Sequence, residues 1–147
     1  MNFKNTILLV TLVVSCFLIG CEKKKTAIAS QDSVFFIEPK DGASVTSPFT
    51  VKFGLTGMTI KPAGQDMMDT RSGHHHILID NPAGFTPKGE VVAADATNIH
   101  YGKGQTETSL TLPVGKHTLT LQFADGAHRS YGKEMAATIT VYVTAAQ

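Results

Sequence analysis

The stretch Phe49-Thr50-Val51-Lys52-Phe53-Gly54-Leu55 is the clearest indication of the fold class. Its apolar side chains recur at every second position, and Thr50 and Lys52 fall between them. A period of two is the pattern of a β-strand that buries one face and exposes the other. We therefore expect a strand here, in a sheet that covers a hydrophobic core on one side.

Similar short runs follow along the chain, separated by Gly, Pro and Asn. They predict strands at 34–38, 49–55, 74–80, 98–101, 105–112, 116–124 and 137–143, with a further short strand at 90–93. No stretch shows a helical period. Short strands joined by turns are typical of an all-β domain, so residues 34–147 are predicted to form an immunoglobulin-like antiparallel β-sandwich of seven to eight strands.

The segment Leu112-Pro113-Val114-Gly115-Lys116-His117-Thr118-Leu119 supports this fold. It is similar to the corner before the sixth strand of immunoglobulin-like domains, where an aromatic side chain bonds back to the backbone. His117 has the same parity as Leu119 and Leu121, so it should point toward the core. We interpret His117 as this corner residue and not as a ligand.

The first twenty residues are predicted to be a targeting segment. Lys4 precedes an apolar run, Ile7 to Ile19, that is shorter than the roughly 20 residues of a membrane span. The run ends in Leu18-Ile19-Gly20-Cys21, which resembles a bacterial lipobox. This predicts a lipoprotein signal peptide at 1–20 and a lipid anchor, including palmitate, on Cys21; an ordinary secretory signal or an uncleaved anchor are the alternatives.

The residues after Cys21 bear on localisation. Glu22 stands where an Asp would favour inner-membrane retention, so an outer-membrane lipoprotein facing the periplasm is favoured. Residues 21–33 are rich in Lys, Ala and Ser, and we expect a flexible tether there. Both cysteines, Cys16 and Cys21, belong to the N-terminal segment, so neither a disulfide nor a thiolate metal site is expected in the domain.

Charge and motifs argue against several function classes. Thirteen Lys and Arg stand against twelve Asp and Glu, a formal net charge of +1, so no nucleic-acid partner is expected. No glycine-rich phosphate loop lies between a strand and a helix, and no Gly-x-Ser-x-Gly elbow occurs. We therefore do not expect an enzyme.

The candidate functional residues are mainly histidines. Three of the six histidines are consecutive, His74-His75-His76. Because side chains alternate along a strand, His74 and His76 should share one face, about 7 Å apart, and His75 should face the core with Ile77. In an immunoglobulin-like sandwich the loops at one end would bring His100, from the other sheet, and His128 to this strand, so that five histidines gather near one pole.

Such a cluster favours a transition-metal site, with copper or zinc bound by His74, His76, His100 and His128. Met67, Met68 and Asp125 are further candidate ligands, and a carboxylate or backbone carbonyl should hold the second nitrogen of each imidazole. The alternative is a non-catalytic scaffold with a protein partner in the envelope. Its histidines would form a structural hydrogen-bond network with one another and with Asp80 or Asp125.

Several of these motifs also resemble a known family. The segments 73–80, 99–107 and 115–128, with 39–43 and 51–55, are similar to the bacterial domain-of-unknown-function family 4399. The resemblance covers about residues 34–143. It implies an exported domain, and it implies no catalytic mechanism.

Overall fold

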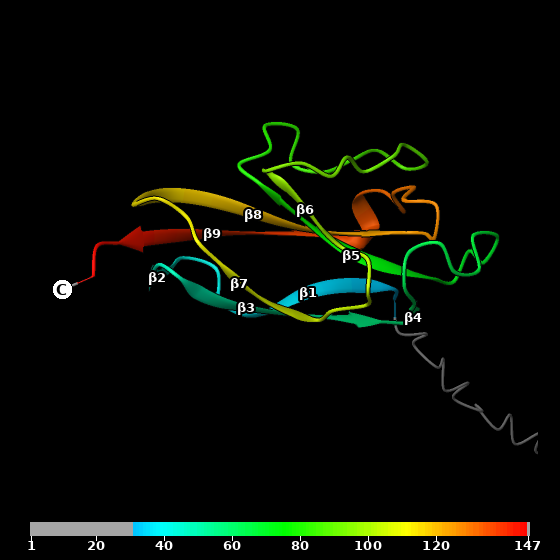
Figure 1. Ribbon diagram of the computed structural model, residues 1–147, viewed down its shortest axis with the longest axis horizontal. Coiled ribbons are helices and arrows are strands. Elements are labelled where there is room, and N and C mark those ends of the chain that lie inside the picture. The colour runs from blue at the N-terminus through cyan, green and yellow to red at the C-terminus, as the bar shows by residue number, and fades with distance from the viewer. Residues whose placement is uncertain (1–30, 147) are drawn as a thin grey trace, which may run out of the picture.

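The computed structural model describes residues 31–146, which form two β-sheets packed as layers (Figure 1). The signal segment, Cys21 and most of the tether lie outside the described residues. Asp32 forms an ion pair with Arg71, and the first strand begins at Ser33. The folded domain therefore includes the last residues of the expected tether. Among residues 31–146, no helix has the length and apolar character needed to cross a membrane.

The smaller sheet has three antiparallel strands in the order β1-β3-β7. These are β1 (Ser33–Glu38), β3 (Phe49–Thr56) and β7 (Glu107–Leu110). The larger sheet has the order β2-β9-β8-β5-β4, with β6 also paired to β5. Its strands are β2 (Ala43–Thr46), β4 (Thr59–Ile60), β5 (Ser72–Ile79), β6 (Asn98–Tyr101), β8 (Gly115–Ala124) and β9 (Ala136–Thr144).

The predicted all-β sandwich is confirmed, with local differences. The short strands β2 and β4 were not expected, and they pair in parallel with β9 and β5. They have only four and two residues, too few for a period to be visible in the sequence. The predicted strand at 90–93 is absent, and Val91 forms only an isolated bridge to Arg129. A short 3₁₀ turn, Lys133–Met135, precedes β9.

The main core lies between the two sheets. Its fully buried side chains come from both layers and follow the alternation of each strand: Val51, Phe53, Ile77, Leu119, Leu121, Phe123 and Val141. The period of two read from residues 49–55 therefore describes the buried face of β3 correctly.

Strand β5 differs from the others because all eight of its residues are buried. One face, with Ile77 and Ile79, packs into the main core. On the other face, Leu78 forms a second small cluster with Val92 and Ala124. Figure 1 shows that the loop between β5 and β6 lies on this outer side of the larger sheet. The outer face of β5 is therefore covered by this loop and buried from solvent.

The position of β6 corrects one expectation. Residues 98–101 were assigned to the opposite sheet, but β6 pairs antiparallel with β5 in the same sheet. In this register His100 lies directly opposite His76. The short strand thus brings its histidine to β5 by backbone pairing, and not by approach of two loops.

Candidate metal centre

Four imidazole rings converge on the outer face of β5. The ring centroid of His74 lies 4.9 Å from each of the ring centroids of His76, His100 and His128. The Nε2 atoms of His74 and His76 are 3.1 Å apart, and those of His100 and His128 are 3.2 Å apart. One ligand nitrogen from each of His74, His76 and His100 lies within 4.8 Å of the other two. The four histidines predicted as ligands are therefore brought together.

Regular backbone pairing positions three of these side chains. His74 and His76 are two residues apart on β5 and therefore project from the same face. Their partners on β8 are Ala124 and Gln122, and His100 stands opposite His76 on β6. Hydrogen-bonded strands on both sides hold β5, so these three rings have a rigid support.

The fourth side chain comes from the loop after β8. The backbone of His128 has a φ of 65°, in the left-handed region that residues other than glycine seldom adopt. Asp125 stabilises this turn: its Oδ1 accepts hydrogen bonds from the backbone N–H groups of Ala127 and Arg129, both at 2.8 Å. The carbonyl of His128 in turn accepts a bond from the N–H of Val92. A strained residue kept in place in this way is frequent at functional sites.

The loop between β4 and β5 ties the last two histidines together. The N–H of Ala63 donates to the carbonyl of Gly102, two residues after His100. The N–H of Gly64 donates to the carbonyl of Gly126, two residues before His128. One loop is therefore bonded to both segments that deliver the histidines outside β5.

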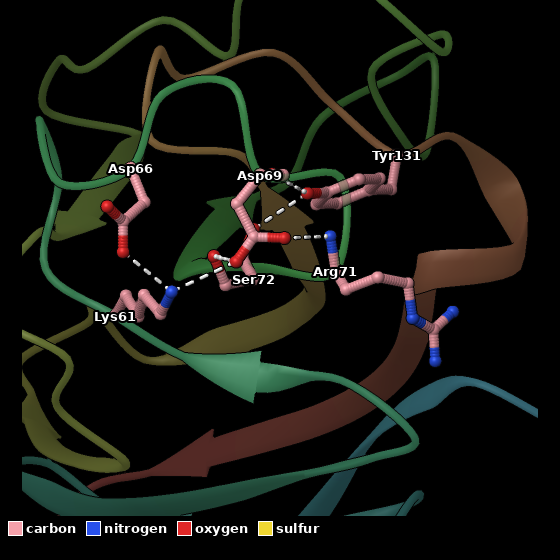
Figure 2. A network of polar contacts seen from close by, with 6 residues as sticks. All are labelled: Lys61, Asp66, Asp69, Arg71, Ser72 and Tyr131. Carbon is pink, nitrogen blue, oxygen red and sulfur yellow. Dashed lines mark hydrogen bonds and ion pairs between the residues drawn. The ribbon is translucent and has the colours of Figure 1, made fainter.

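A polar network fixes that loop (Figure 2). The ammonium of Lys61 bonds to Asp66 at 2.7 Å and to Asp69 at 2.9 Å, and Asp69 also accepts from the hydroxyl of Ser72. Hydrogen bonds from Ser72, and then from Lys61, lower the pKa of Asp69 to about 2. The hydroxyl of Tyr131 donates to the carbonyl of Ser72 at 2.7 Å. The network joins the loop to the first residue of β5.

Two glycines permit the close packing of the site. A Cβ at Gly102 would clash with the imidazole of His100, which folds back over this residue. A Cβ at Gly73, just before His74, would clash with the carbonyl oxygen of Ala124 on β8. Only the tertiary structure shows that Gly102 leaves room for the ring of His100.

The electrostatic environment keeps the β5 imidazoles neutral. Burial, and then repulsion from the other histidines, lowers the pKa of His74 to about 4 and that of His76 to about 3. The pKa of His100 is lowered for the same two reasons. A neutral imidazole has a free lone pair on one ring nitrogen, which is the form that binds metals.

One expectation about the second nitrogens is wrong. The Nδ1 atoms of His74 and His76 are buried and have no hydrogen-bond partner among the described protein groups. No carboxylate or carbonyl orients these two rings. The packing of β5 between β6 and β8 supplies the orientation instead.

The remaining candidate ligands have other surroundings. Asp125 uses its carboxylate within its own turn and in an ion pair with Arg129. Met67 is 53% exposed and Met68 is 90% exposed, both in the loop between β4 and β5. The backbone carbonyl of Asp125 accepts a hydrogen bond from the N–H of His128 at 2.9 Å. Among residues 31–146, no side-chain hydrogen bond joins Asp125, Met67 or Met68 to the four rings.

His75 and His117 stand apart from the cluster. His75 lies on the opposite face of β5, fully buried between Phe53 and Phe123, with ring centroids 5.0 Å from each. The pole that was predicted to contain five histidines therefore contains four, because His75 lies on the other face of β5. His117 bonds to the carbonyl of Pro113, as the corner interpretation predicted, and to Asp80.

Gln122 was not among the predicted site residues. As a polar residue on the outer face of β8 it would be expected in solvent, yet it is fully buried beside His76. Its side-chain nitrogen donates to the carbonyls of Gly132 and Met135, both at 3.1 Å, and its oxygen accepts from the N–H of Thr86. Gln122 thus ties two covering loops to the sheet beneath the site.

Comparison with known proteins assigns the family. Residues 51–144 match the family described as a domain of unknown function (DUF4399). The chain belongs to this family. DUF4399 membership assigns no activity, so the chemistry of the site rests on its own residues. No curated protein matches the sequence.

Two solved structures resemble this DUF4399 chain. One is the endo-β-1,4-mannanase from Thermotoga petrophila, with 15% identity and a TM-score of 0.47 over 78% of this chain and 20% of the mannanase chain. The other comprises fibronectin(III)-like modules of Clostridium thermocellum CbhA, with 14% identity and a TM-score of 0.41 over 78% of this chain and 99% of that chain. The chain spans about a fifth of the length of the mannanase.

Proposed function

We propose that this domain binds one transition-metal ion, copper or zinc, through His74, His76, His100 and His128. The observation that carries the proposal is the convergence of four imidazoles from β5, β6 and the loop after β8. Zinc–nitrogen bonds of 2.0–2.1 Å place the nitrogens of a tetrahedral site about 3.3 Å apart. The two Nε2–Nε2 separations of 3.1 and 3.2 Å are close to that distance.

The hydrogen-bond inventory favours a metal over a structural network. Each neutral imidazole has one donor and one acceptor nitrogen. Of the four nitrogens of His74 and His76, only the two Nε2 atoms have a partner, which is each other. Asp80 bonds to His117, and Asp125 bonds within its own turn, so neither serves the cluster as the network alternative required. A metal bound at the two Nε2 atoms would coordinate both lone pairs in place of the single hydrogen bond that these atoms can share, with the proton of each neutral ring on Nδ1.

The proposed setting is the bacterial envelope. The lipobox ending at Cys21 supports a lipoprotein that holds the domain at a membrane, with the outer membrane favoured and the domain in the periplasm. Ligands of the imidazole type suit an oxidising compartment, because they do not form disulfides. The proposed role is metal binding in this compartment, without catalysis.

Metal titration of the full chain, purified in detergent and without a polyhistidine tag, tests the proposal. One equivalent of Zn²⁺, Cu²⁺ or Cu⁺ should bind per chain, and His74→Ala and His76→Ala should each abolish or strongly weaken binding. His75→Phe is the matched control, because His75 lies between the two in sequence but on the other face of β5. An equal loss of metal affinity in all three variants, or no metal binding by the folded wild-type protein, would reject the site.

A further inference from the structure

The shape of the histidine cluster bears on which ions it accepts, an inference that rests on the function proposed above. Six distances describe the relative positions of four rings. Five of the six centroid separations fall between 4.8 and 5.0 Å, and only that between His76 and His128 is longer, at 6.0 Å. The four rings therefore form a tetrahedron with one stretched edge.

A square-planar arrangement has a different pattern of distances. In a square, every ligand has two near neighbours and one opposite partner about 1.4 times farther away. His74 lies 4.9 Å from all three other rings. His100 lies 4.9, 5.0 and 4.8 Å from its three neighbours. Two of the four rings thus have no opposite partner, and the cluster is not planar.

The fold resists flattening of this arrangement. His74 and His76 are fully buried on a strand that is hydrogen-bonded on both sides. His100 rests against Gly102 and stands opposite His76 in the β5–β6 register. Rotation of these rings into one plane would require close-packed side chains and strands to move together, which is costly in a dense interior. His128 is the only one of the four on a loop; the hydrogen bonds of its turn hold its backbone, and its side chain can adjust.

We infer that this site selects ions that prefer tetrahedral coordination, Zn²⁺ or Cu⁺, over Cu²⁺ and Ni²⁺, which prefer square or tetragonal ligand sets. His74, His76 and His100 form the rigid part of the site, and His128 is the looser fourth ligand. Tetrahedral sites are typical of ions with a filled d shell, because their d electrons impose no square or tetragonal geometry.

Zn²⁺ and Cu⁺ share this geometry and differ in charge and softness. Among residues 31–146, no carboxylate is hydrogen-bonded to any of the four rings, and Asp125 acts on His74 only through its charge. The ligands themselves are neutral and do not offset the charge of the ion, which favours the monovalent one. Imidazole is a borderline ligand that suits zinc, whereas soft sulfur ligands favour Cu⁺. Separate titrations with the two ions distinguish them.

The test compares ions on the untagged full chain in detergent. Zn²⁺ and Ni²⁺ are titrated against a competing chelator, and Cu⁺ is titrated under anaerobic conditions. The Zn²⁺ dissociation constant should be at least about tenfold lower than that of Ni²⁺, the reverse of what flexible nitrogen sites show. Bound Co²⁺ should give the intense visible absorption of a four-coordinate tetrahedral complex, and Cu⁺ should bind at one equivalent.

Variants test the division between rigid and loose ligands. His128→Ala should weaken Zn²⁺ binding by roughly tenfold, and His76→Ala by roughly a hundredfold or more. His75→Phe is the control and should leave the affinity for Zn²⁺ unchanged. Such a result would show that loss of a histidine beside the site does not by itself weaken binding. Circular dichroism of each variant establishes that the domain is still folded.

The outcomes separate this inference from the proposed function. A Ni²⁺ affinity equal to that of Zn²⁺, or a weak octahedral Co²⁺ spectrum, would overturn the tetrahedral selection and leave metal binding in place. Failure of the folded wild-type chain to bind any of these ions would overturn both.

Discussion

His117 bonds to Asp80 through its Nδ1 atom at 2.7 Å, while its Nε2 atom lies 2.9 Å from the carbonyl oxygen of Pro113. An ionised carboxylate and a carbonyl both only accept hydrogen bonds, so both ring nitrogens of His117 must donate. The ring is therefore an imidazolium in this arrangement. Asp80 also accepts from the backbone N–H of Thr118 at 2.7 Å, so one pair joins the end of β5, the corner and the start of β8.

Replacing this ring should destabilise the fold without touching the metal site. We expect His117→Ala to lower the free energy of unfolding by about 1–3 kcal/mol, because a charged hydrogen-bonding group is lost and a buried ring is removed. Urea denaturation measures this value. The affinity of the folded variant for Zn²⁺ should equal that of wild type. A large loss of affinity with unchanged stability would contradict the corner role.

The same pair should make stability depend on pH. Burial lowers the pKa of His117, but its hydrogen bonds to Asp80 and Pro113 outweigh burial and raise it above 6.5. For Asp80, burial acts to raise the pKa, and the bonds from His117 and Thr118 outweigh it and lower the pKa below 3.8. The His117 contribution is complete below pH 6.5 and is lost as pH rises through its folded pKa. The Asp80 contribution is complete above pH 3.8 and is lost as pH falls.

The pair should therefore stabilise the domain most between pH 3.8 and 6.5. The stability difference between wild type and His117→Ala, followed by urea denaturation from pH 4 to about pH 9, isolates this contribution from other titrating groups. The difference should shrink at alkaline pH. A difference that grows as pH rises above neutrality would show that the neutral ring is the stabilising form.

His75 should be replaceable by an apolar ring. It is fully buried, and neither of its ring nitrogens has a hydrogen-bond partner among the described residues. A buried unpaired polar group costs about 1–3 kcal/mol, and a phenyl ring retains the edge contacts with Phe53 and Phe123. We expect His75→Phe to raise the melting temperature. A clear decrease would mean that His75 makes a polar contact essential to the core.

Gly102 should be needed for metal binding and not for folding. The side chain introduced by Gly102→Ala would push the imidazole of His100 out of its place. We expect the Zn²⁺ affinity to fall by roughly tenfold or more. Lys103→Ala, at the next and exposed position of the turn, is the matched control. If both variants bind zinc equally well, His100 is not a ligand in the observed position.

Cys21 should carry the membrane anchor. Cys21→Ala removes the only residue of the predicted lipobox that can be acylated. The variant should lose incorporation of labelled palmitate, which measures lipidation directly. It should also fail to yield the mature, membrane-bound form on cell fractionation. Unchanged palmitate labelling would exclude Cys21 as the acylated residue.

Much of the fold could be predicted because alternation is a local property. Residues 49–55 and 116–124 direct every second side chain into the core, so both strands were predicted close to their observed bounds. The burial of Gln122 on the other face of β8 could not be predicted in this way. Strand β5 is harder to interpret, because both of its faces are buried and the outer one is covered by loops. Strands β2 and β4 are too short to show a period, and their parallel pairing depends on distant partners.

Local sequence was enough to place His74 and His76 on one face of β5 and His75 on the other, because side-chain direction on a strand depends only on parity. Tertiary structure decided which residues join them. The pairing of β6 with β5 set His100 opposite His76, the left-handed turn brought in His128, and the turn after β8 occupied Asp125. Strand register, loop path and burial arise from contacts between segments far apart in the chain, which a local pattern does not contain.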